Sequence, residues 1–194
     1  RNEQVEKLVY TSSTAVYGPS LREPITENDP RSVAFDSHYD LSKFLAEKEV
    51  LQYASEGHLA VIVQPSRVYG TGIATPANII SSLLLKALQG KIILLPGKPD
   101  VVGNYAYIED VVKGHINAMA AGKKGEQYIL GGENLSYRNI TQVIEQSLGP
   151  IPVMHIPVPI AKLLARIYIA IKKISGGEAH FNASGLVRYT RNTA

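Results

Sequence analysis

Apolar residues recur along the chain in two patterns, short runs and longer stretches with helical spacing. The segments 5–13 and 58–65 are short and largely apolar, which is typical of buried strands. Between them, residues 38–56 place apolar side chains along one helical stripe. A strand, a helix and a strand in this order predict two parallel strands joined by a right-handed crossover.

The remainder continues this alternation with smaller elements. Residues 18–37 contain three prolines and several acidic residues, so this segment is predicted to be a loop. The order of elements predicts an α/β fold, with part of a parallel sheet first and a smaller α+β lobe later. Further helices are predicted at 76–89, 110–121, 136–148 and 159–174, and strands or extended segments at 92–97, 104–108, 127–130 and 150–157.

Helix ends carry their own signals. Pro76 stands near the first turn of helix 76–89, a position that proline favours. Gly57 follows the helix at 38–56 and is predicted to end it. Ser136 is a predicted N-cap. Because Asn139 occupies the third helical position instead of Glu or Gln, we predict a cap without a complete capping box.

Candidate chemistry lies where the first strand ends. Residues 11–18 read Thr-Ser-Ser-Thr-Ala-Val-Tyr-Gly, and Tyr39 and Lys43 follow on the next helix. Residues four apart share a helix face, and open α/β sheets bind ligands at the carboxyl ends of their strands. A hydroxyl, a phenol and an ammonium can therefore meet one carbonyl group there. Such a set can move a proton while a nicotinamide moves a hydride.

The Tyr39/Lys43 spacing has a competing explanation. Tyr168 and Lys172 show the same spacing without a strand that runs into hydroxyl residues before them, and an aromatic–cation pair on a helix surface needs no function. The strand and hydroxyl run before Tyr39 favour catalysis for that pair.

Five segments together resemble the extended branch of the short-chain dehydrogenase/reductase superfamily, the NAD-dependent epimerase/dehydratase family. The similarity is greatest to its dihydroflavonol-reductase-like and hopanoid-associated epimerase-like subgroup. The resemblance implies a Rossmann-like doubly wound parallel sheet. Residues 1–75 would form the second half of the dinucleotide-binding domain and 76–194 mostly a substrate-binding lobe, with 104–122 crossing back. The segments are 10–18, the Tyr39/Lys43 pair, 64–70, 107–111 and 128–136.

The resemblance also implies roles for individual residues. Ser13 would hydrogen-bond the substrate oxygen, Tyr39 would be the acid or base, and Lys43 would favour the phenolate and contact the nicotinamide ribose. Cofactor contacts are expected from Ser12, Tyr39, Lys43, Pro65 and Ser66, and substrate contacts from Thr14 and Asn78. For Asn78, a plain capping role explains the residue equally well.

No Gly-rich phosphate-binding turn occurs in the sequence. We therefore expect that the chain lacks the N-terminal half of the family's domain and is inactive by itself. The choice between NAD and NADP cannot be read, because the residue that contacts the ribose 2′ position belongs to that half. The alternative is a non-catalytic relative that binds a ligand or partner with the same fold.

The substrate is expected to be a small molecule with a carbonyl or hydroxyl group. Nucleotide-sugar members of the resembled branch usually carry an Arg where this chain has Gly103. That difference shifts the expectation toward dihydroflavonol-like, sterol-like or lipid-linked sugar substrates. Reduction, epimerisation and dehydration all stay open.

The composition limits the classes of partner that the protein is expected to bind. The chain is 45% hydrophobic and 19% charged with a net charge of +3, which is ordinary for a globular protein and gives no nucleic-acid patch. It has no Cys and no metal-type His spacing, so we expect a cytoplasmic protein without a metal site. Residues 160–173 form a basic amphipathic helix. Packing in the lobe is favoured over contact with a membrane surface, and a homodimer stays open.

Overall fold

The computed structural model describes residues 5–20, 24–31, 33–72, 78–175 and 190–193. The chain forms two compact units. One, called the sheet unit, comprises Arg1–Gly70 and Tyr105–Glu133, and the other, called the lobe unit, comprises Thr71–Asn104 and Asn134–Ala194. Chain segments alternate between the units, so neither unit is a continuous stretch of sequence.

The sheet unit is built on three parallel strands in the order β1-β2-β6. These are β1 (Leu8–Thr11), β2 (Ala60–Pro65) and β6 (Gln127–Leu130). The central strand β2 is buried at all six positions, because it is paired on both sides and covered on both faces. Its parallel pairing with β1 confirms the predicted strand–helix–strand arrangement.

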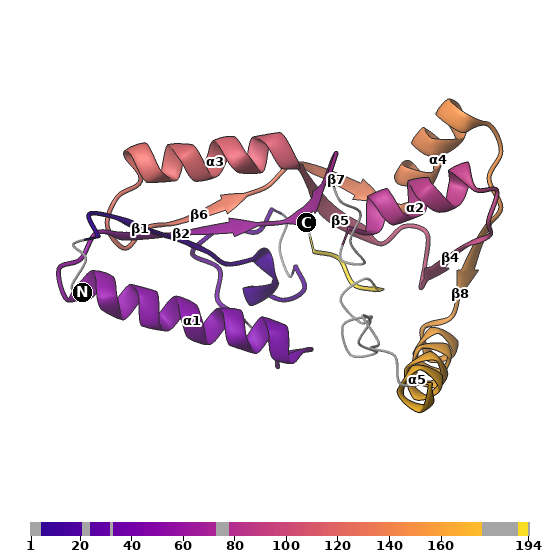
Figure 1. The fold of residues 1–194 in the computed structure, drawn as a ribbon, viewed down its shortest axis with the longest axis horizontal. Coiled ribbons are helices and arrows are strands. Elements are labelled where there is room, and N and C mark those ends of the chain that lie inside the picture. Colours follow the sequence, from indigo (N-terminus) through magenta and orange to yellow (C-terminus); the bar gives the residue numbers. More distant parts are fainter. Residues whose placement is uncertain (1–4, 21–23, 32, 73–77, 176–189, 194) are drawn as a thin grey trace. The chain divides into compact units, whose positions relative to one another are not determined.

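Two helices cover the two faces of this sheet (Figure 1). α1 (His38–Ser55) lies on one face and α3 (Ile108–Ala121) on the other. α1 starts where predicted, since Ser37 adopts an extended conformation and its hydroxyl accepts a hydrogen bond from the Asp40 amide. α3 starts two residues before the predicted Asp110, because the backbone is already helical after the extended Tyr107.

On the α3 side, Val61, Val63 and Ala118 form the centre of the buried core. Val9 and Leu130 pack against them from the neighbouring strands. These branched side chains stand on one face of adjacent strands, and this is the packing that the apolar runs in the sequence predict.

Three short strands follow the order β3-β5-β7: β3 (Arg67–Tyr69), β5 (Val102–Tyr107) and β7 (Glu133–Ser136). The chain passes between the units within β5 and again within β7. β3 and β7 are absent from the elements predicted by the sequence. β7 has the residues Glu-Asn-Leu-Ser, which lack both an apolar run and strand-like alternation, so nothing local marks it.

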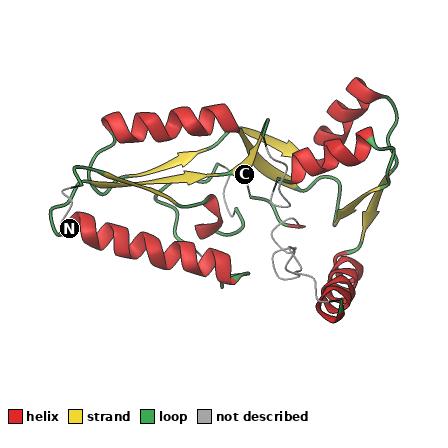
Figure 2. Ribbon diagram, viewed as in Figure 1, coloured by secondary structure: helices red, strands yellow, loops and turns green. Residues whose placement is uncertain are grey.

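Among its described residues, the lobe unit contains three helices and a parallel strand pair (Figure 2). The strands are β4 (Ile93–Pro96) and β8 (Val153–Ile156), with Ile93 opposite Val153. The helices are α2 (Ile79–Leu88), α4 (Tyr137–Leu148) and α5 (Val158–Ile174). The largest fully buried side chains of this unit are those of Ile93, Leu95 and Tyr137.

Two predictions about helix starts need correction. α2 begins at Ile79 with Asn78 as its N-cap, and Pro76 lies outside the described residues. Ser136 and Asn139 form a complete capping box, contrary to the prediction, because the Asn139 carboxamide accepts a hydrogen bond from the Ser136 amide at 3.0 Å. A short amide side chain thus does what Glu or Gln usually does.

Gly132 provides a test of packing inside the sheet unit. A Cβ atom at this position would overlap the carbonyl oxygen of Tyr105 and lie 2.9 Å from the Cα atom of Ala106. Because both are backbone atoms, we expect Gly132→Ala to lower the free energy of unfolding by about 1–3 kcal/mol in urea denaturation. Glu133→Ala at the exposed neighbouring position is the control, and equal stability of both variants would contradict this packing.

Candidate active site

The hydroxyl run after β1 turns sharply into a short 3-10 helix, η1 (Thr14–Val16). Ser12 and Ser13 are buried, while Thr14 is half-buried. The Ser13 Oγ accepts a hydrogen bond from the Ala15 amide at 3.3 Å. That bond leaves the Ser13 hydroxyl hydrogen available to donate, which is the role predicted for it toward a substrate oxygen.

Lys43 reaches from α1 to the end of β1. Its Nζ atom donates to the carbonyl oxygen of Thr11 at 2.8 Å and lies 5.2 Å from the centroid of the Tyr10 ring. The same Nζ lies 6.0 Å from the centroid of the Tyr39 ring, at the outer limit of cation–π attraction. The structure therefore brings Lys43, the Tyr39 ring and the carboxyl end of β1 together.

The Tyr39 side chain is accessible to a ligand. It is 50% exposed, and its hydroxyl makes no hydrogen bond to another described residue. Tyr39 and Ser13 share no hydrogen bond in the described part of the chain, so their convergence on one substrate oxygen stays a prediction. Among the residues that the structure describes, the phenol is neither enclosed by aliphatic side chains nor tied to a structural partner.

The end of β2 carries the next predicted contacts. Pro65 and Ser66 are both buried, and the Ser66 amide donates to the Leu130 carbonyl at 3.1 Å. The Ser66 hydroxyl is buried with no hydrogen-bond partner among the described residues. Since buried hydroxyls normally have a partner, this one fits a contact with a bound cofactor.

Asn78 belongs to the lobe unit and is the N-cap of α2. Its Oδ1 atom accepts a hydrogen bond from the Ser81 amide at 3.1 Å. The capping role is therefore observed, and a role in substrate binding stays a prediction. The competing Tyr168/Lys172 pair lies on α5, which belongs to the lobe unit.

A buried polar network is centred on Gln64, and the sequence did not predict it. Gln64 is fully buried in β2. Its Oε1 accepts from the Tyr17 hydroxyl at 2.7 Å, and its Nε2 donates to Glu47 Oε1 at 2.8 Å and to Gln127 Oε1 at 3.0 Å. The network joins the segment after β1 to the middle of α1.

Burial controls the protonation of this network. Removal from water raises the pKa of the Tyr17 phenol well above its ordinary range; the hydrogen bond with Gln64 opposes this shift and the Glu47 charge adds to it. Tyr17 is therefore a fixed hydrogen-bond donor. Burial likewise raises the pKa of Glu47, against the opposing effects of the Ser12 hydroxyl, the Gln64 amide and the Lys43 charge.

Two features of the sequence could have indicated this network. Glu47 follows Lys43 by four residues, so both lie on the same side of α1 as Tyr39. Gln64 continues the apolar run at 59–63, and a polar residue inside a buried strand needs partners.

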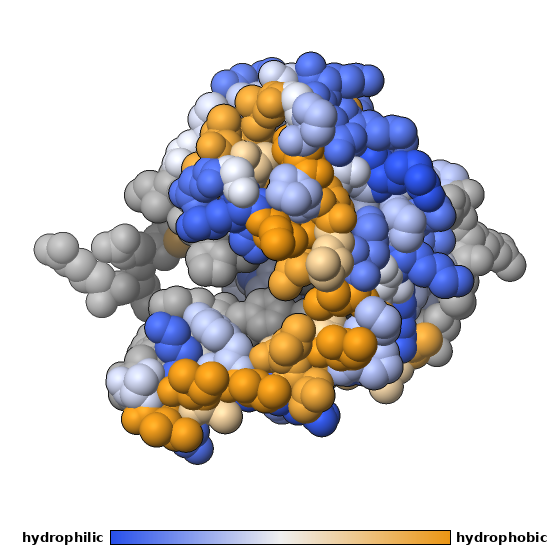
Figure 3. Space-filling model, turned by 90° about the vertical axis from the view of Figure 1, so that its right-hand side faces the viewer, coloured by the Kyte–Doolittle hydropathy of each residue, from blue (hydrophilic) through white to orange (hydrophobic). Residues whose placement is uncertain are grey.

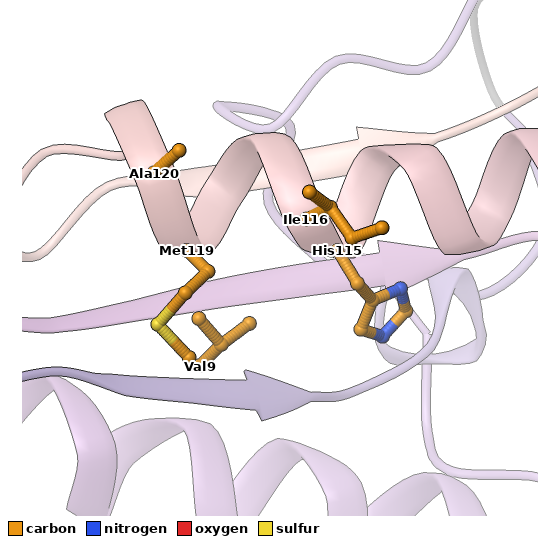
Figure 4. A pocket seen from close by; sticks show the side chains of 5 residues that line it. All are labelled: Val9, His115, Ile116, Met119 and Ala120. Carbon is orange, nitrogen blue, oxygen red and sulfur yellow. The ribbon is translucent and has the colours of Figure 1, made fainter.

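The α3 side of the sheet has a different character (Figure 4). An apolar depression of about 470 Å³ is lined by Val9, His115, Ile116, Met119 and Ala120. It includes none of the residues predicted for catalysis. The His115 Nδ1 must donate to the Val111 carbonyl at 2.8 Å, so in the neutral ring Nε2 accepts from the Thr11 hydroxyl at 2.9 Å. Both ring nitrogens of His115 thus have structural partners.

Comparison with known proteins decides the family. The profile of the NAD dependent epimerase/dehydratase family matches residues 1–131, which is more than half of the chain. The chain belongs to this family. Its α/β fold with parallel strands is the fold of the family's solved members, as the sequence predicted.

Two curated relatives illustrate the range of the family. The chain is 28% identical over 179 residues to N-acetyl-alpha-D-glucosaminyl-diphospho-ditrans,octacis-undecaprenol 4-epimerase of Escherichia coli O157:H7, covering 89% of this chain and 52% of that protein. It is 32% identical over 161 residues to a putative dihydroflavonol 4-reductase of Synechocystis, covering 79% of this chain and 46% of the relative. The chain thus spans about half the length of these relatives.

A solved structure gives the same match in three dimensions. The dTDP-glucose 4,6-dehydratase from Bacillus anthracis, in complex with NAD, superimposes with a TM-score of 0.69 at 27% identity. The superposition covers 78% of this chain and 49% of the dehydratase. The chain and this NAD-bound dehydratase therefore share a fold over most of the chain.

We expect Gln64 to be the polar residue of the sheet unit whose substitution lowers the stability of the fold most. Gln64→Leu removes the partners of Tyr17, Glu47 and Gln127 at once. Each buried partner left unpaired costs about 1–3 kcal/mol, so the free energy of unfolding in urea should fall by about 3 kcal/mol or more. Gln127→Leu breaks one bond only and is the control. Similar losses in both variants would contradict a central role for Gln64.

Glu47 should make stability depend on pH. Since burial raises its pKa in the folded state, its contribution to stability is fully present below the unfolded pKa and is lost as pH rises through the folded pKa. Glu47→Gln stays neutral and keeps an oxygen that can accept from Gln64. We expect wild type to lose stability relative to this variant as pH rises from about 4 toward neutral.

The measurement is a series of urea denaturation curves of both proteins across that pH range. A difference in unfolding free energy between wild type and Glu47→Gln that is constant with pH would show that Glu47 does not titrate differently on folding.

Proposed function

We propose that the protein is an NAD(P)-dependent oxidoreductase, epimerase or dehydratase in which Tyr39 transfers the proton. The observation that carries this proposal is the position of Lys43, whose ammonium is held at the carboxyl end of β1 and beside the Tyr39 ring. From this position the Lys43 ammonium can hold a nicotinamide ribose beside the accessible Tyr39 hydroxyl, and that hydroxyl can exchange a proton with a substrate oxygen.

Tyr39 has the access that proton transfer requires. Its exposed hydroxyl, without a structural partner among the described residues, can give a proton to a carbonyl oxygen in reduction and take one from a hydroxyl in oxidation. A bound nicotinamide would supply or accept the hydride. Proton transfer by a positioned group contributes about 10²–10⁴-fold to such a reaction.

Lys43 can serve a second purpose. Its ammonium has three donors, and one of them is used by the Thr11 carbonyl. The other two can bind the hydroxyls of the nicotinamide ribose. The unpartnered Ser66 hydroxyl, together with Pro65 and Ser12, completes the set of cofactor contacts that we assign to the sheet unit.

Ser13 would orient the substrate. Its oxygen accepts from the Ala15 amide, so its hydroxyl hydrogen can point to a substrate carbonyl oxygen. Thr14 adds a second hydroxyl in the same segment, and Asn78 is the candidate contact from the lobe unit. Together with Tyr39, two donors on one oxygen would stabilise the charge that develops there during the reaction.

The substrate class is a small molecule with a secondary alcohol or ketone. The relatives act on a diphospho-polyprenol-linked sugar and, as named, on a dihydroflavonol, and these substrates share that group. We propose a sugar-like, sterol-like or dihydroflavonol-like substrate, with NAD or NADP as the cofactor. Residues of the lobe unit would supply the substrate contacts.

The substitution Tyr39→Phe, made in the full-length protein, tests the proposal. The substitution removes only the hydroxyl, so we expect turnover to fall by about 10²–10⁴-fold while nicotinamide binding, followed by fluorescence quenching, is retained. Lys43→Met should weaken the binding of the nicotinamide as well as turnover.

Tyr168→Phe, in the other Tyr/Lys pair of the same spacing, is the matched control and should leave turnover unchanged. Unchanged turnover in Tyr39→Phe would contradict the catalytic role. Nicotinamide binding without turnover on any carbonyl or hydroxyl substrate would instead identify a non-catalytic ligand-binding member of the family.

A further inference from the structure

Helix α5 leaves a broad apolar stripe exposed on the lobe unit. Its members recur at the spacing i, i+3, i+4, i+7, i+8 and i+11, which places them on one side of the helix. Their side chains are 46–59% exposed, although an apolar stripe of this width normally faces a protein core. The residues are Ile160, Leu163, Leu164, Ile167, Tyr168 and Ile171.

A different side of α5 is buried. Ala161 and Ala165 are only 4% and 7% exposed, and Ile169 is half-buried. The sequence favoured a helix packed within the lobe over one in contact with a membrane surface. Instead, the small alanines are buried, and the large Leu and Ile side chains are left on the outside.

The charges around this stripe all have one sign. α5 carries Lys162, Arg166, Lys172 and Lys173 and contains no acidic residue. In the sequence, no Asp or Glu occurs between Glu145 and Glu178. A basic helix with one large apolar side is complementary to a surface that combines negative charge with hydrocarbon.

The strand pair β4/β8 adds to the apolar surface of the same unit. Leu94 and Met154 are opposite each other in the register, and they are 46% and 51% exposed. Lys91 and Lys98 stand on either side of β4 in the sequence. In Figure 3, hydrophobic side chains cover the bottom of this face, at the height of α5 in Figure 1. They continue upward across the middle of the face.

No helix among the described residues is long and apolar enough to cross a membrane. We propose that the lobe unit binds the surface of an anionic lipid bilayer, with α5 lying in the plane of the interface. Its Leu and Ile stripe would enter the boundary between headgroups and acyl chains, and its lysines and arginine would contact anionic headgroups. The residues of this surface belong to the lobe unit and include neither Tyr39 nor Lys43, so the proposal does not depend on the reaction.

Co-sedimentation of the 194-residue chain with lipid vesicles tests the proposal. We expect binding to vesicles of phosphatidylcholine mixed equally with phosphatidylglycerol, weaker binding in high salt, and little binding to phosphatidylcholine alone. Ile167→Glu combined with Ile171→Glu should weaken vesicle binding by about 100-fold or more, because two apolar side chains that would enter the bilayer are lost. Lys172→Gln with Lys173→Gln should weaken it by about fivefold for each lysine.

Val143→Glu with Leu148→Glu is the matched control, since it adds the same charge at exposed apolar positions of α4. This variant should bind as wild type does, and circular dichroism establishes that each variant is folded. Binding that does not require phosphatidylglycerol, or that both α5 variants retain, would overturn the proposal. So would dimers in sedimentation velocity that the isoleucine substitutions disperse without any vesicle binding, because a second copy would then cover the stripe.

Discussion

The buried carboxamide of Gln64 fixes how three segments of the sheet unit meet. β2 is paired on both sides and buried along its length, so this side chain has no access to water. Every polar atom of the carboxamide must then find a protein partner, and an unmet one would be costly. Tyr17, Glu47 and Gln127 meet that demand from three different segments of the chain.

This constraint extends to the candidate chemistry through α1. The bond from Gln64 to Glu47 holds the middle of the helix against the sheet, and Lys43 lies one turn earlier on the same side. Lys43 can therefore reach the Thr11 carbonyl, and Tyr39 lies a further turn toward the helix start. The Lys43 charge also opposes the rise that burial causes in the pKa of the Glu47 carboxyl, so the buried network responds to a charge of the candidate site.

The two units use their apolar residues differently. In the sheet unit, Val61, Ile62 and Val63 are completely buried, which gives a rigid platform for groups at the strand ends. In the lobe unit, α5 and the β4/β8 pair keep large apolar side chains on the surface. A rigid unit suits catalytic groups that need fixed positions, whereas an apolar, basic surface suits contact with a partner.

Much of the architecture follows from local patterns. The strand–helix–strand start, the limits of α1 and the positions of β4, β6 and β8 agree with the sequence, because apolar periodicity and capping residues act over a few neighbours. The Tyr39/Lys43 pair also comes from local spacing on one helix. β3 and β7 were not predicted, since their strand conformation depends on β5 lying beside them.

Chain segments far apart in the sequence determined the rest. Gln64 lies 47 residues from Tyr17 and 63 from Gln127, and no pattern within a window can pair such residues. Likewise, the sequence of α5 predicted an amphipathic helix but not which of its sides would be buried. By itself, the sequence determined the helices, the main strands and the family, because these depend on neighbouring residues. Only the tertiary structure decided which polar groups meet in the interior and which apolar side chains stay outside, because both depend on what packs against each face.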